Sequence, residues 1–565
     1  MSVRRFRGLD RHWPAFWTCI LAAIVCGAAR GETSDSSLPH IVQKEGRYAL
    51  FVDGAPYLML GAQVNSSSAW PAMLPRVWPA MEALHVNTVE IPVYWEQIEP
   101  QQGQFDFTLV DTLLAEAREH RLRLVLLWFA TWKNGSNHYM PPWMKLEHER
   151  YPNVIGRDGK EVDSPSPLAG ATLQADIAAF RALMTHLKSA DLHHTVLMVQ
   201  VENEPGAWGS VRDYSPAAEK AFAGPVPTEA LAAMAKPTDQ AAASWQEVFG
   251  DDADEFFQVW CVASYVGKVA AAGKEVYPLP LYVNAALRDP VAPRHPPKYE
   301  VGGPNDNVFL LWKAAAPAVD VLAPDIYQRE TAKYLKALDL YQRPDNPLFI
   351  PETMGQGPIT RFFYAALGRG AIGYAPFGMD NTRSSPASVA ATTEDGITGT
   401  AANYQAVAPM SREIARLNLE GKLQTAVEGE PEPNAAQLSA APVSQGASGP
   451  PARVLNFDGW GATIAFGTFA RGGPRPQTQP AEPDGRVLIA QLGPNQFLVT
   501  GLHARVTFFP TGNADGKTSQ YLSVEEGQYE NGVFQAARIL NGDQTDWGLI
   551  FASTPSVLRV SLYTR

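Results

Sequence analysis

Two apolar runs in this sequence each lead directly into a glutamate: TVLMVQV at Thr195–Val201 continues as Glu-Asn-Glu-Pro-Gly, and PLFIP at Pro347–Pro351 continues as Glu-Thr. Runs of this kind are typical of parallel strands that are covered on both faces. In a parallel β/α barrel, catalytic side chains converge at the C-terminal ends of the strands. We therefore expect Glu204 and Glu352 to meet at one end of a barrel.

Eight strand-like runs alternate with helix-like segments such as Leu109–Glu119 and Asp176–Lys188. This alternation is typical of a (β/α)8 TIM barrel of about 250 residues that carries insertions. We predict that the barrel, with its closing helices, covers residues 38–425. The eight runs are Tyr57–Gln63, Asn87–Tyr94, Arg123–Phe129, Val196–Val201, Leu281–Ala285, Val321–Ile326, Leu348–Pro351 and Ala371–Pro376.

The composition changes after the barrel. Residues 426–452 are rich in Pro, Gly, Ala, Ser and Glu, which predicts a linker or a long surface loop. Short β-like runs then recur, separated by turn signals such as Asn531-Gly532 and Asn541-Gly542. We predict that residues 453–565 form a small all-β, sandwich-like domain.

The N-terminus has the pattern of an export signal. Four arginines among the first 11 residues precede the apolar stretch Phe16–Val25, which is shorter than the roughly 20 residues of a membrane span. Ala29 and Gly31 then form a small-x-small cleavage site. We predict that residues 1–31 are a signal peptide and that the mature chain is exported, to the periplasm or the medium. A twin-arginine signal and a retained anchor are the alternatives.

Composition and charge argue against several classes of protein. The chain has 565 residues, of which 45% are hydrophobic and 18% charged, an ordinary globular mixture. The formal charge of -12 argues against nucleic acid or an anionic membrane as the main partner. Cys261 is the only cysteine left after signal removal, so neither a disulfide nor a cysteine-based metal cluster is expected. No phosphate loop or dinucleotide fingerprint is present, and we expect no cofactor and no metal.

The string Gln200-Val201-Glu202-Asn203-Glu204 resembles the strand-4 signature of glycoside hydrolase family 35, the retaining β-galactosidases. Trp95–Pro100 resembles the segment after strand 2 that is shared across the same clan of barrel glycosidases. The resemblance covers about 38–381, and the tail resembles a small β domain of a compact bacterial branch. Two departures concern the leaving-group side: Pro205 replaces the usual Tyr, and Ala375–Asp380 replaces a Gly-Gly-Thr-Asn-Phe string.

The resemblance implies a division of labour between two carboxyl groups. Glu204 would be the acid/base, protonated near neutral pH, and Glu352 the ionised nucleophile, although both are glutamates. In retaining enzymes the two carboxyl groups lie about 5–5.5 Å apart. In the clan, Asn203 holds the sugar 2-hydroxyl. Tyr327, directly after a strand-like run, is placed to donate a hydrogen bond to Glu352.

Five further residues lie near the ends of strand-like runs or after them and are candidates for sugar contact, with plain packing as the alternative for each. They are Asn65, Tyr94, Trp132, Asn134 and Asn284.

Three functions from different classes remain open at this stage. The first is an exo-acting, retaining β-galactosidase that removes terminal galactose from oligosaccharides or polysaccharides, such as plant cell-wall glycans. The second is an endo-β-glycanase of the same clan, such as a mannanase or a glucanase. The third is a non-catalytic, carbohydrate-binding barrel. Linkage, aglycone and oligomeric state do not follow from the sequence.

Overall fold

The computed structural model describes residues 38–237, 242–380, 382, 397–431, 453–469, 476–478, 482–512 and 517–565. These residues fall within one of the two units of the chain, Ser37–Arg565. The predicted signal peptide and residues 432–452 of the predicted linker lie outside the described residues. Among the described residues, no helix combines the length and the apolar composition that crossing a bilayer requires.

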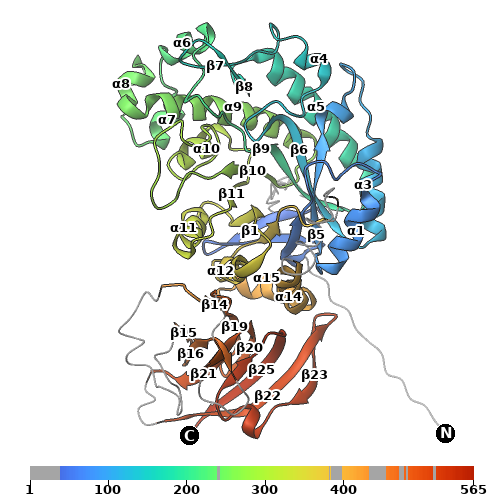
Figure 1. The fold of residues 1–565 in the computed structure, drawn as a ribbon, viewed down its shortest axis with the longest axis vertical. Helices are drawn as coiled ribbons and strands as arrows, with labels where there is room; N and C mark the ends of the chain where they lie inside the picture. Colours follow the sequence, from blue (N-terminus) through green and yellow to red (C-terminus); the bar gives the residue numbers. More distant parts are fainter. Residues whose placement is uncertain are drawn as a thin grey trace, which may run out of the picture. The chain divides into compact units, whose positions relative to one another are not determined.

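Eight parallel strands close into a barrel in the order β4-β5-β6-β9-β10-β11-β12-β13 (Figure 1). Each strand overlaps one of the eight predicted runs, so the predicted TIM barrel is confirmed. β9 is buried along its whole length, as expected of a parallel strand covered on both faces. The strands are β4 (Met59–Gln63), β5 (Thr88–Tyr94), β6 (Arg123–Lys133), β9 (Val196–Asn203), β10 (Leu281–Ala286), β11 (Val321–Ile326), β12 (Phe349–Thr353) and β13 (Gly373–Pro376).

Helices connect the strands and pack around the barrel (Figure 1). In α3 (Thr108–Glu119), Leu109, Val110, Leu113 and Leu114 are buried, the stripe that a 3.6-residue period predicts. The others are α1 (Leu74–Ala83), α2 (Trp95–Ile98), α4 (Pro142–Lys145), α5 (Gly170–Ala190), α6 (Pro216–Phe222), α7 (Thr228–Ala233), α8 (Trp245–Phe249), η2 (Gly250–Asp252), α9 (Ala253–Val276), α10 (Phe309–Ala315), α11 (Thr331–Tyr341), η3 (Gly357–Arg361), α12 (Phe362–Gly368), α14 (Ile397–Val407), η5 (Ala408–Met410) and α15 (Ser411–Leu419).

Two small antiparallel sheets accompany the barrel. β1 (His40–Lys44), β2 (Arg47–Val52) and β3 (Ala55–Tyr57) precede the first barrel strand, and α15 packs against β2 and β3. β7 (Asn153–Ile155) and β8 (Glu161–Pro165) form a hairpin between β6 and α5.

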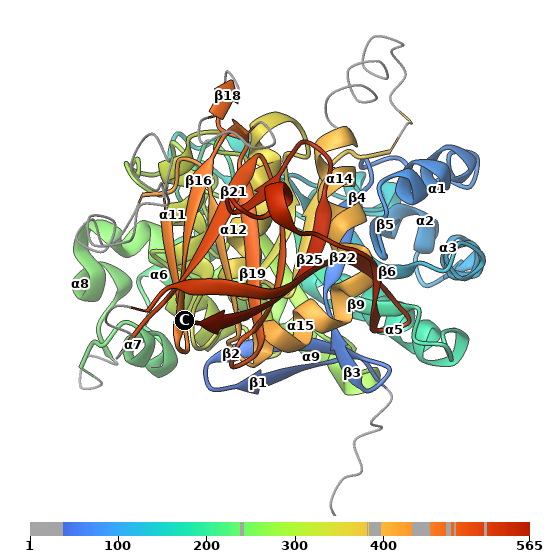
Figure 2. The ribbon, with the colours of Figure 1, turned by 90° about the horizontal axis from the view of Figure 1, so that it is seen from below.

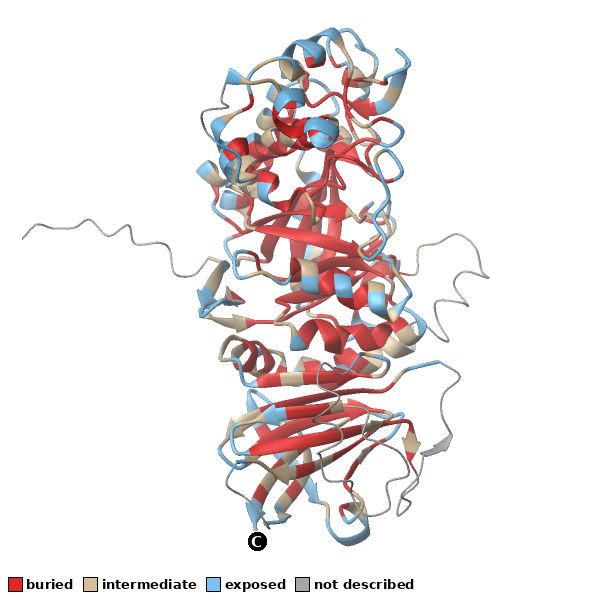
Figure 3. Ribbon diagram, turned by 90° about the vertical axis from the view of Figure 1, so that its left-hand side faces the viewer, coloured by how far each residue is buried: buried red, intermediate tan, exposed pale blue. Residues whose placement is uncertain are grey.

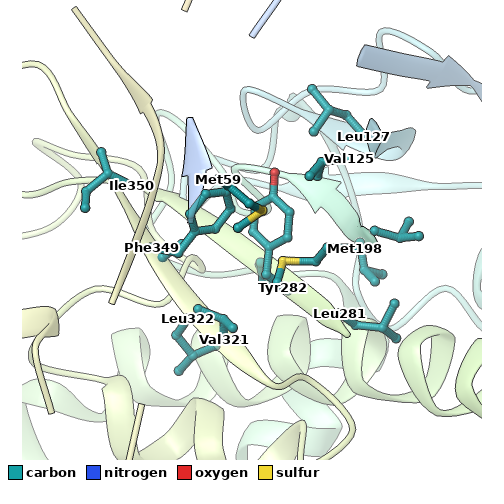
Figure 4. Close-up of a cluster of buried hydrophobic side chains, with 14 of the residues drawn as sticks. Met59, Val125, Leu127, Met198, Leu281, Tyr282, Val321, Leu322, Phe349 and Ile350 are labelled. Carbon is teal, nitrogen blue, oxygen red and sulfur yellow. The ribbon is translucent and has the colours of Figure 1, made fainter. Parts of the chain in front are cut away.

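Large side chains fill the inside of the barrel (Figure 4). Tyr282 of β10 and Phe349 of β12 meet edge to face, with ring centroids 5.1 Å apart. Gly373 of β13 makes room for them, because a Cβ atom there would lie 2.8 Å from Met59 and 2.9 Å from Phe349. The barrel is therefore a packed core, and ligands have access only at its ends.

The C-terminal region contains two packed antiparallel sheets (Figure 2), as predicted, and a third sheet that consists of β17 and β18 alone. Six strands form one sheet in the order β14-β19-β20-β25-β22-β23, and four form the other in the order β15-β16-β21-β24. The strands are β14 (Leu423–Val427), β15 (Arg453–Phe457), β16 (Trp460–Phe466), β17 (Thr468–Phe469), β18 (Pro476–Thr478), β19 (Arg486–Gly493), β20 (Gln496–Leu502), β21 (Ala504–Pro510), β22 (Ser519–Glu530), β23 (Val533–Ile539), β24 (Leu549–Phe551) and β25 (Ser556–Thr564), with η6 (Gly542–Gln544) before β24.

Strands of the C-terminal region are extensively buried (Figure 3). β19 and β20 of the six-stranded sheet are buried on both faces over most of their length. Val487 and Ile489 point into the core between the two sheets, whereas Leu488 and Ala490 join the core of the barrel. This alternation follows from the two-residue period of a strand. At Gly368, the last residue of α12, a Cβ atom would lie 2.1 Å from the Thr425 hydroxyl of β14. The helix and the strand therefore approach closely, and β14 already belongs to the C-terminal sheet.

Candidate active site

The two glutamates that end the decisive runs line one cavity of about 560 Å³ at the carboxyl end of the barrel. Glu352 lies in β12, and Glu204 follows β9 directly. Glu204 has a φ of 47°, in the left-handed region that is uncommon for residues other than glycine. Such a backbone conformation persists only where its surroundings hold it. The other residues that line the cavity are Ser66, Lys133, Asn134, His138, Tyr139, Tyr327 and Phe377.

Glu352 has two different carboxyl oxygens. Tyr327 donates a short hydrogen bond from its hydroxyl to Oε1. No donor among the described residues reaches Oε2, although this atom is buried. The side chain is thus held through one oxygen, and the other has no competing partner. That is the arrangement a carboxylate nucleophile needs.

The surroundings of Glu204 disfavour the charged form of its carboxyl group. Burial and the nearby charge of Glu352 raise the pKa of Glu204 to about 7, while Lys133 acts in the opposite direction. A carboxyl group with this pKa is partly protonated at neutral pH, so it can give a proton and later take one back. The environment therefore suits Glu204 to acid/base chemistry.

Asn284 links the ends of three strands beneath the cavity. Its Oδ1 accepts a hydrogen bond of 2.9 Å from the backbone N–H of Glu204. Its Nδ2 donates to Asn203 Oδ1 at 3.3 Å and to Asp325 Oδ2 at 2.8 Å. Asn203 is fully buried, and its Nδ2 donates to Asn134 Oδ1 at 3.4 Å. In this structure, therefore, Asn203 and Asn284 hold the cavity floor, and Asn134 is the amide that lines the cavity.

Two other candidates lie behind the lining. Asn65 donates from its backbone and its side chain to Asp380, at 2.6 and 2.9 Å, and its neighbour Ser66 lines the cavity. Tyr94 is buried and stacks at 5.2 Å on Tyr139, which does line it.

Trp132 does not line the cavity, contrary to the expectation that it contacts sugar. Its ring is fully buried and meets Tyr265 of α9 edge to face, with centroids 4.8 Å apart. The next residue, Lys133, faces the cavity instead. The pairing of β6 with β9 is irregular between Trp128 and Lys133, so a simple alternation of faces along β6 fails there.

Lys133, His138 and Asp325 are residues of the site that the sequence analysis did not select. Lys133 is 6% exposed, and its ammonium group donates to Asn134 Oδ1. Burial and the charges of Glu352 and Glu204 raise the pKa of Asp325 well above its usual range. Both Lys133 and Asp325 are charged residues inside or beside an apolar strand-like run, and that contrast was a signal for them. His138 carries no such signal.

No group of three or more His, Cys, Asp or Glu side chains in the described parts of the chain has the arrangement of a metal site.

Comparison with known proteins identifies two segments. Residues 70–266 match the family model described as β-galactosidase, that of glycoside hydrolase family 42, and residues 400–552 match a domain of unknown function, DUF5597. The first segment includes Glu204 and ends before Glu352. The matching model is thus one of β-galactosidases, but the assignment to family 35 is not supported.

A curated β-galactosidase from Xanthomonas manihotis is 30% identical over 172 residues, which are 29% of this chain and 26% of that protein. The match thus spans about a quarter of the relative's length. Among solved structures, a β-galactosidase from Bacillus circulans sp. alkalophilus has a TM-score of 0.47 at 16% identity, over 64% of this chain and 57% of that one. A β-galactosidase from Rahnella sp. R3 has a TM-score of 0.45 at 15% identity, over 67% and 59%. Part of the barrel is therefore similar in sequence to β-galactosidases.

Proposed function

We propose that this protein is a retaining β-galactosidase that releases terminal β-D-galactose, with Glu352 as nucleophile and Glu204 as acid/base. The observation that carries the proposal is the asymmetry of the two glutamates in one cavity. Burial and Glu352 raise the pKa of Glu204 to about 7, and Tyr327 donates a hydrogen bond to Glu352. The similarity of residues 70–266 to β-galactosidases supports the choice of sugar.

In the first step, Oε2 of Glu352 attacks the anomeric carbon of the galactoside. The bond between this carbon and the glycosidic oxygen breaks, and the carboxyl proton of Glu204 moves to the departing oxygen. A covalent galactosyl ester on Glu352 remains, and Glu204 is left as a carboxylate.

In the second step, a water molecule enters from the side that the leaving group has vacated. Glu204 takes its proton while the water oxygen bonds to the anomeric carbon. The ester bond breaks, Glu352 returns to the carboxylate form, and the sugar leaves with its original β configuration. Asn134 and Lys133 line the same cavity and are the groups we assign to the sugar hydroxyls.

Three finer features belong to the proposal. The cavity of about 560 Å³ lies in the range of sites for small ligands, and we assign to it exo action on a terminal sugar. We assign galactose-capped glycans of plant cell walls as the substrate class. Export of the mature chain after cleavage near residue 31 is tested by N-terminal sequencing of the protein secreted by its host.

Azide rescue tests the two roles. With 2,4-dinitrophenyl β-D-galactoside, Glu204→Ala should form the galactosyl-enzyme and then stall, since no base activates water. Azide should restore turnover and yield the β-galactosyl azide. Azide should rescue Glu352→Ala through the opposite face and yield the α-azide. Opposite anomers in the two variants would reverse the assignment.

A panel of nitrophenyl glycosides tests the sugar. We expect β-galactoside to be the preferred substrate and NMR to detect β-galactose as the first product. Preference for a β-mannoside, or cleavage of internal bonds in mannan or glucan, would support an endo-β-glycanase instead. Binding of sugars without turnover would support a non-catalytic barrel.

A further inference from the structure

A second pair of carboxyl groups lies behind the cavity, at the same strand end that delivers Glu204. Glu202, the next-to-last residue of β9, and Asp176 of α5 are both fully buried. Their carboxyl groups face each other within reach of a hydrogen bond. Two carboxyl groups can form such a bond only when one of them carries a proton, since a carboxylate has no donor.

The remaining hydrogen bonds indicate which of the two carries the proton. Asp176 accepts from three donors: Trp128 Nε1 at 3.0 Å, the Thr131 hydroxyl at 2.8 Å and the Tyr265 hydroxyl at 3.2 Å. Three donors stabilise a carboxylate.

Glu202 is poorer in donors. Its Oε2 accepts a hydrogen bond of 2.7 Å from the backbone N–H of Trp132. Its Oε1 receives none from any described residue. These contacts therefore place the shared proton on Glu202 rather than on Asp176.

The titratable groups that face Glu202 agree with this assignment. α5 presents Asp176, and α9 presents Tyr265, whose hydroxyl is a donor to Asp176. β6 presents backbone N–H groups. Burial and the charge of Asp176 raise the pKa of Glu202 well above its usual range.

The pair is connected to the turn that carries Glu204. Glu202 has a φ of 65°, so two left-handed residues flank Asn203. Its bond to Trp132 ties the end of β9 to the end of β6. The next backbone contacts continue the link: Asn134 N–H donates to Asn203 O at 3.2 Å, and Gly135 N–H donates to Glu204 O at 3.1 Å.

We propose that Glu202 is a positioning residue that, through a proton shared with Asp176, holds the backbone turn of Glu204 in its reactive conformation. The shared proton is inferred from the contacts of Glu202 and Asp176 and does not depend on the proposed function. The positioning part rests on the proposed acid/base role of Glu204.

The decisive comparison is between Glu202→Gln and Glu202→Leu. A glutamine keeps one acceptor for Trp132 N–H and one donor for Asp176, so it imitates the protonated acid. A leucine has a similar size but has neither group. We expect Glu202→Gln to keep kcat for nitrophenyl β-galactoside within about threefold, and Glu202→Leu to lower kcat at least about tenfold with KM within about twofold, because small displacements of a catalytic group cost rate.

Thermal unfolding as a function of pH tests the proton without any sugar. Native Glu202 keeps its proton at a pH where the unfolded chain has lost it, so the wild type loses stability as the pH rises above the usual carboxyl range. Glu202→Gln has no such group. Its Tm should exceed that of the wild type by an amount that grows between about pH 5 and pH 9.

A matched control is Glu255→Gln in α9. Glu255 is also buried, and its Oε1 accepts hydrogen bonds from Tyr299 at 2.6 Å and Asn307 at 2.9 Å. This variant measures the effect of exchanging a buried carboxyl for an amide that has no carboxyl partner. The Tm gain of Glu202→Gln should exceed it at alkaline pH.

The outcomes separate the two parts. A Tm difference that stays constant with pH, or that matches the Glu255→Gln control, would overturn the shared proton. Wild-type kcat in a folded Glu202→Leu, or a Glu202→Gln as slow as Glu202→Leu, would overturn the positioning role. Failure of the wild type to hydrolyse galactosides would instead refute the proposed function, and the pH dependence of Tm would still decide on the proton.

Discussion

The carboxyl end of the barrel and the contact between the barrel and the C-terminal sheet are both buried, yet they are built on opposite principles. At the barrel end, Glu352 Oε2 is buried and lacks a donor among the described residues. At the sheet contact, Leu488, Ala490 and other apolar side chains join the barrel core.

Each principle has an energetic consequence. A buried polar atom without a partner costs about 1–3 kcal/mol, and it is tolerated where a site needs it. Burial of a leucine side chain contributes about 1.5–3 kcal/mol in the other direction. A buried polar group of the sheet contact, Arg486, donates to Asn403 Oδ1 at 2.7 Å. The contact can therefore offset stability that the barrel end gives up for its chemistry.

The largest expected effect is a loss of activity without a loss of stability, caused by a substitution at the barrel end. Glu352→Gln removes the nucleophile and should lower kcat on the order of 10⁴-fold or more. Its Tm should stay near or above that of the wild type, because a neutral amide replaces a buried carboxylate beside Glu204. Steady-state kinetics and calorimetry measure the two effects. A variant that retains a tenth of the wild-type rate would exclude Glu352 as the nucleophile.

A substitution in the contact between the barrel and the C-terminal sheet should lower stability and leave the reaction rate unchanged. Leu488→Ala should lower the free energy of unfolding by about 2–5 kcal/mol, because it leaves a cavity in the shared core. The kcat of the folded fraction should not change. Urea titration, followed by both fluorescence and activity, measures these quantities. An unchanged midpoint would mean that the contact contributes nothing to stability, and Ile489→Ala, on the opposite face of β19, serves as the comparison.

A smaller effect is expected at the hydroxyl that contacts the nucleophile. Tyr327→Phe removes the hydrogen bond to Glu352 and should lower kcat about 10- to 100-fold, the range expected for a bond to a charged group. Tyr327 is 41% exposed, so Tm should change little. If kcat stays within twofold of the wild type, the bond does not matter for the reaction.

The mildest test uses pH alone. Glu204 has a pKa raised to about 7 by burial and by Glu352, and its protonated form is the active one in the first step. For an unactivated galactoside, kcat/KM should therefore fall about tenfold per pH unit above about pH 7. A dinitrophenyl galactoside needs little protonation and should lose much less. A profile for the unactivated substrate that is flat to pH 9 would contradict the role of Glu204.

Much of the fold followed from local patterns. Apolar runs of strand length predicted all eight barrel strands, because parallel strands covered on both faces must be apolar almost throughout. The β-like runs after residue 452 predicted the C-terminal sheets for a related reason, the alternation of a strand with two different faces. Glu352 directly follows such a run, and Glu204 was selected with it because it lies at a second strand end, within a motif that resembles a glycosidase signature.

The interior of the site was decided by tertiary structure. Trp132 and Lys133 are neighbours in sequence, and only the irregular pairing of β6 with β9 determines that the lysine faces the cavity. Asn203 and Asn284 lie at the ends of the expected strands. Their side-chain amides, however, form hydrogen bonds with each other, with Asp325 and with the Glu204 backbone.

The sequence alone therefore determined which chain segments form the barrel and which two glutamates end its strands, because hydrophobic burial acts on patterns a few residues long. Tertiary structure decided what each carboxyl group does. Glu202 and Glu204 are the same residue type two positions apart in one strand end, yet one faces Asp176 in the interior and the other faces Glu352 across a cavity. Their protonation depends on groups that lie far away in the chain, and desolvation and charge act through space.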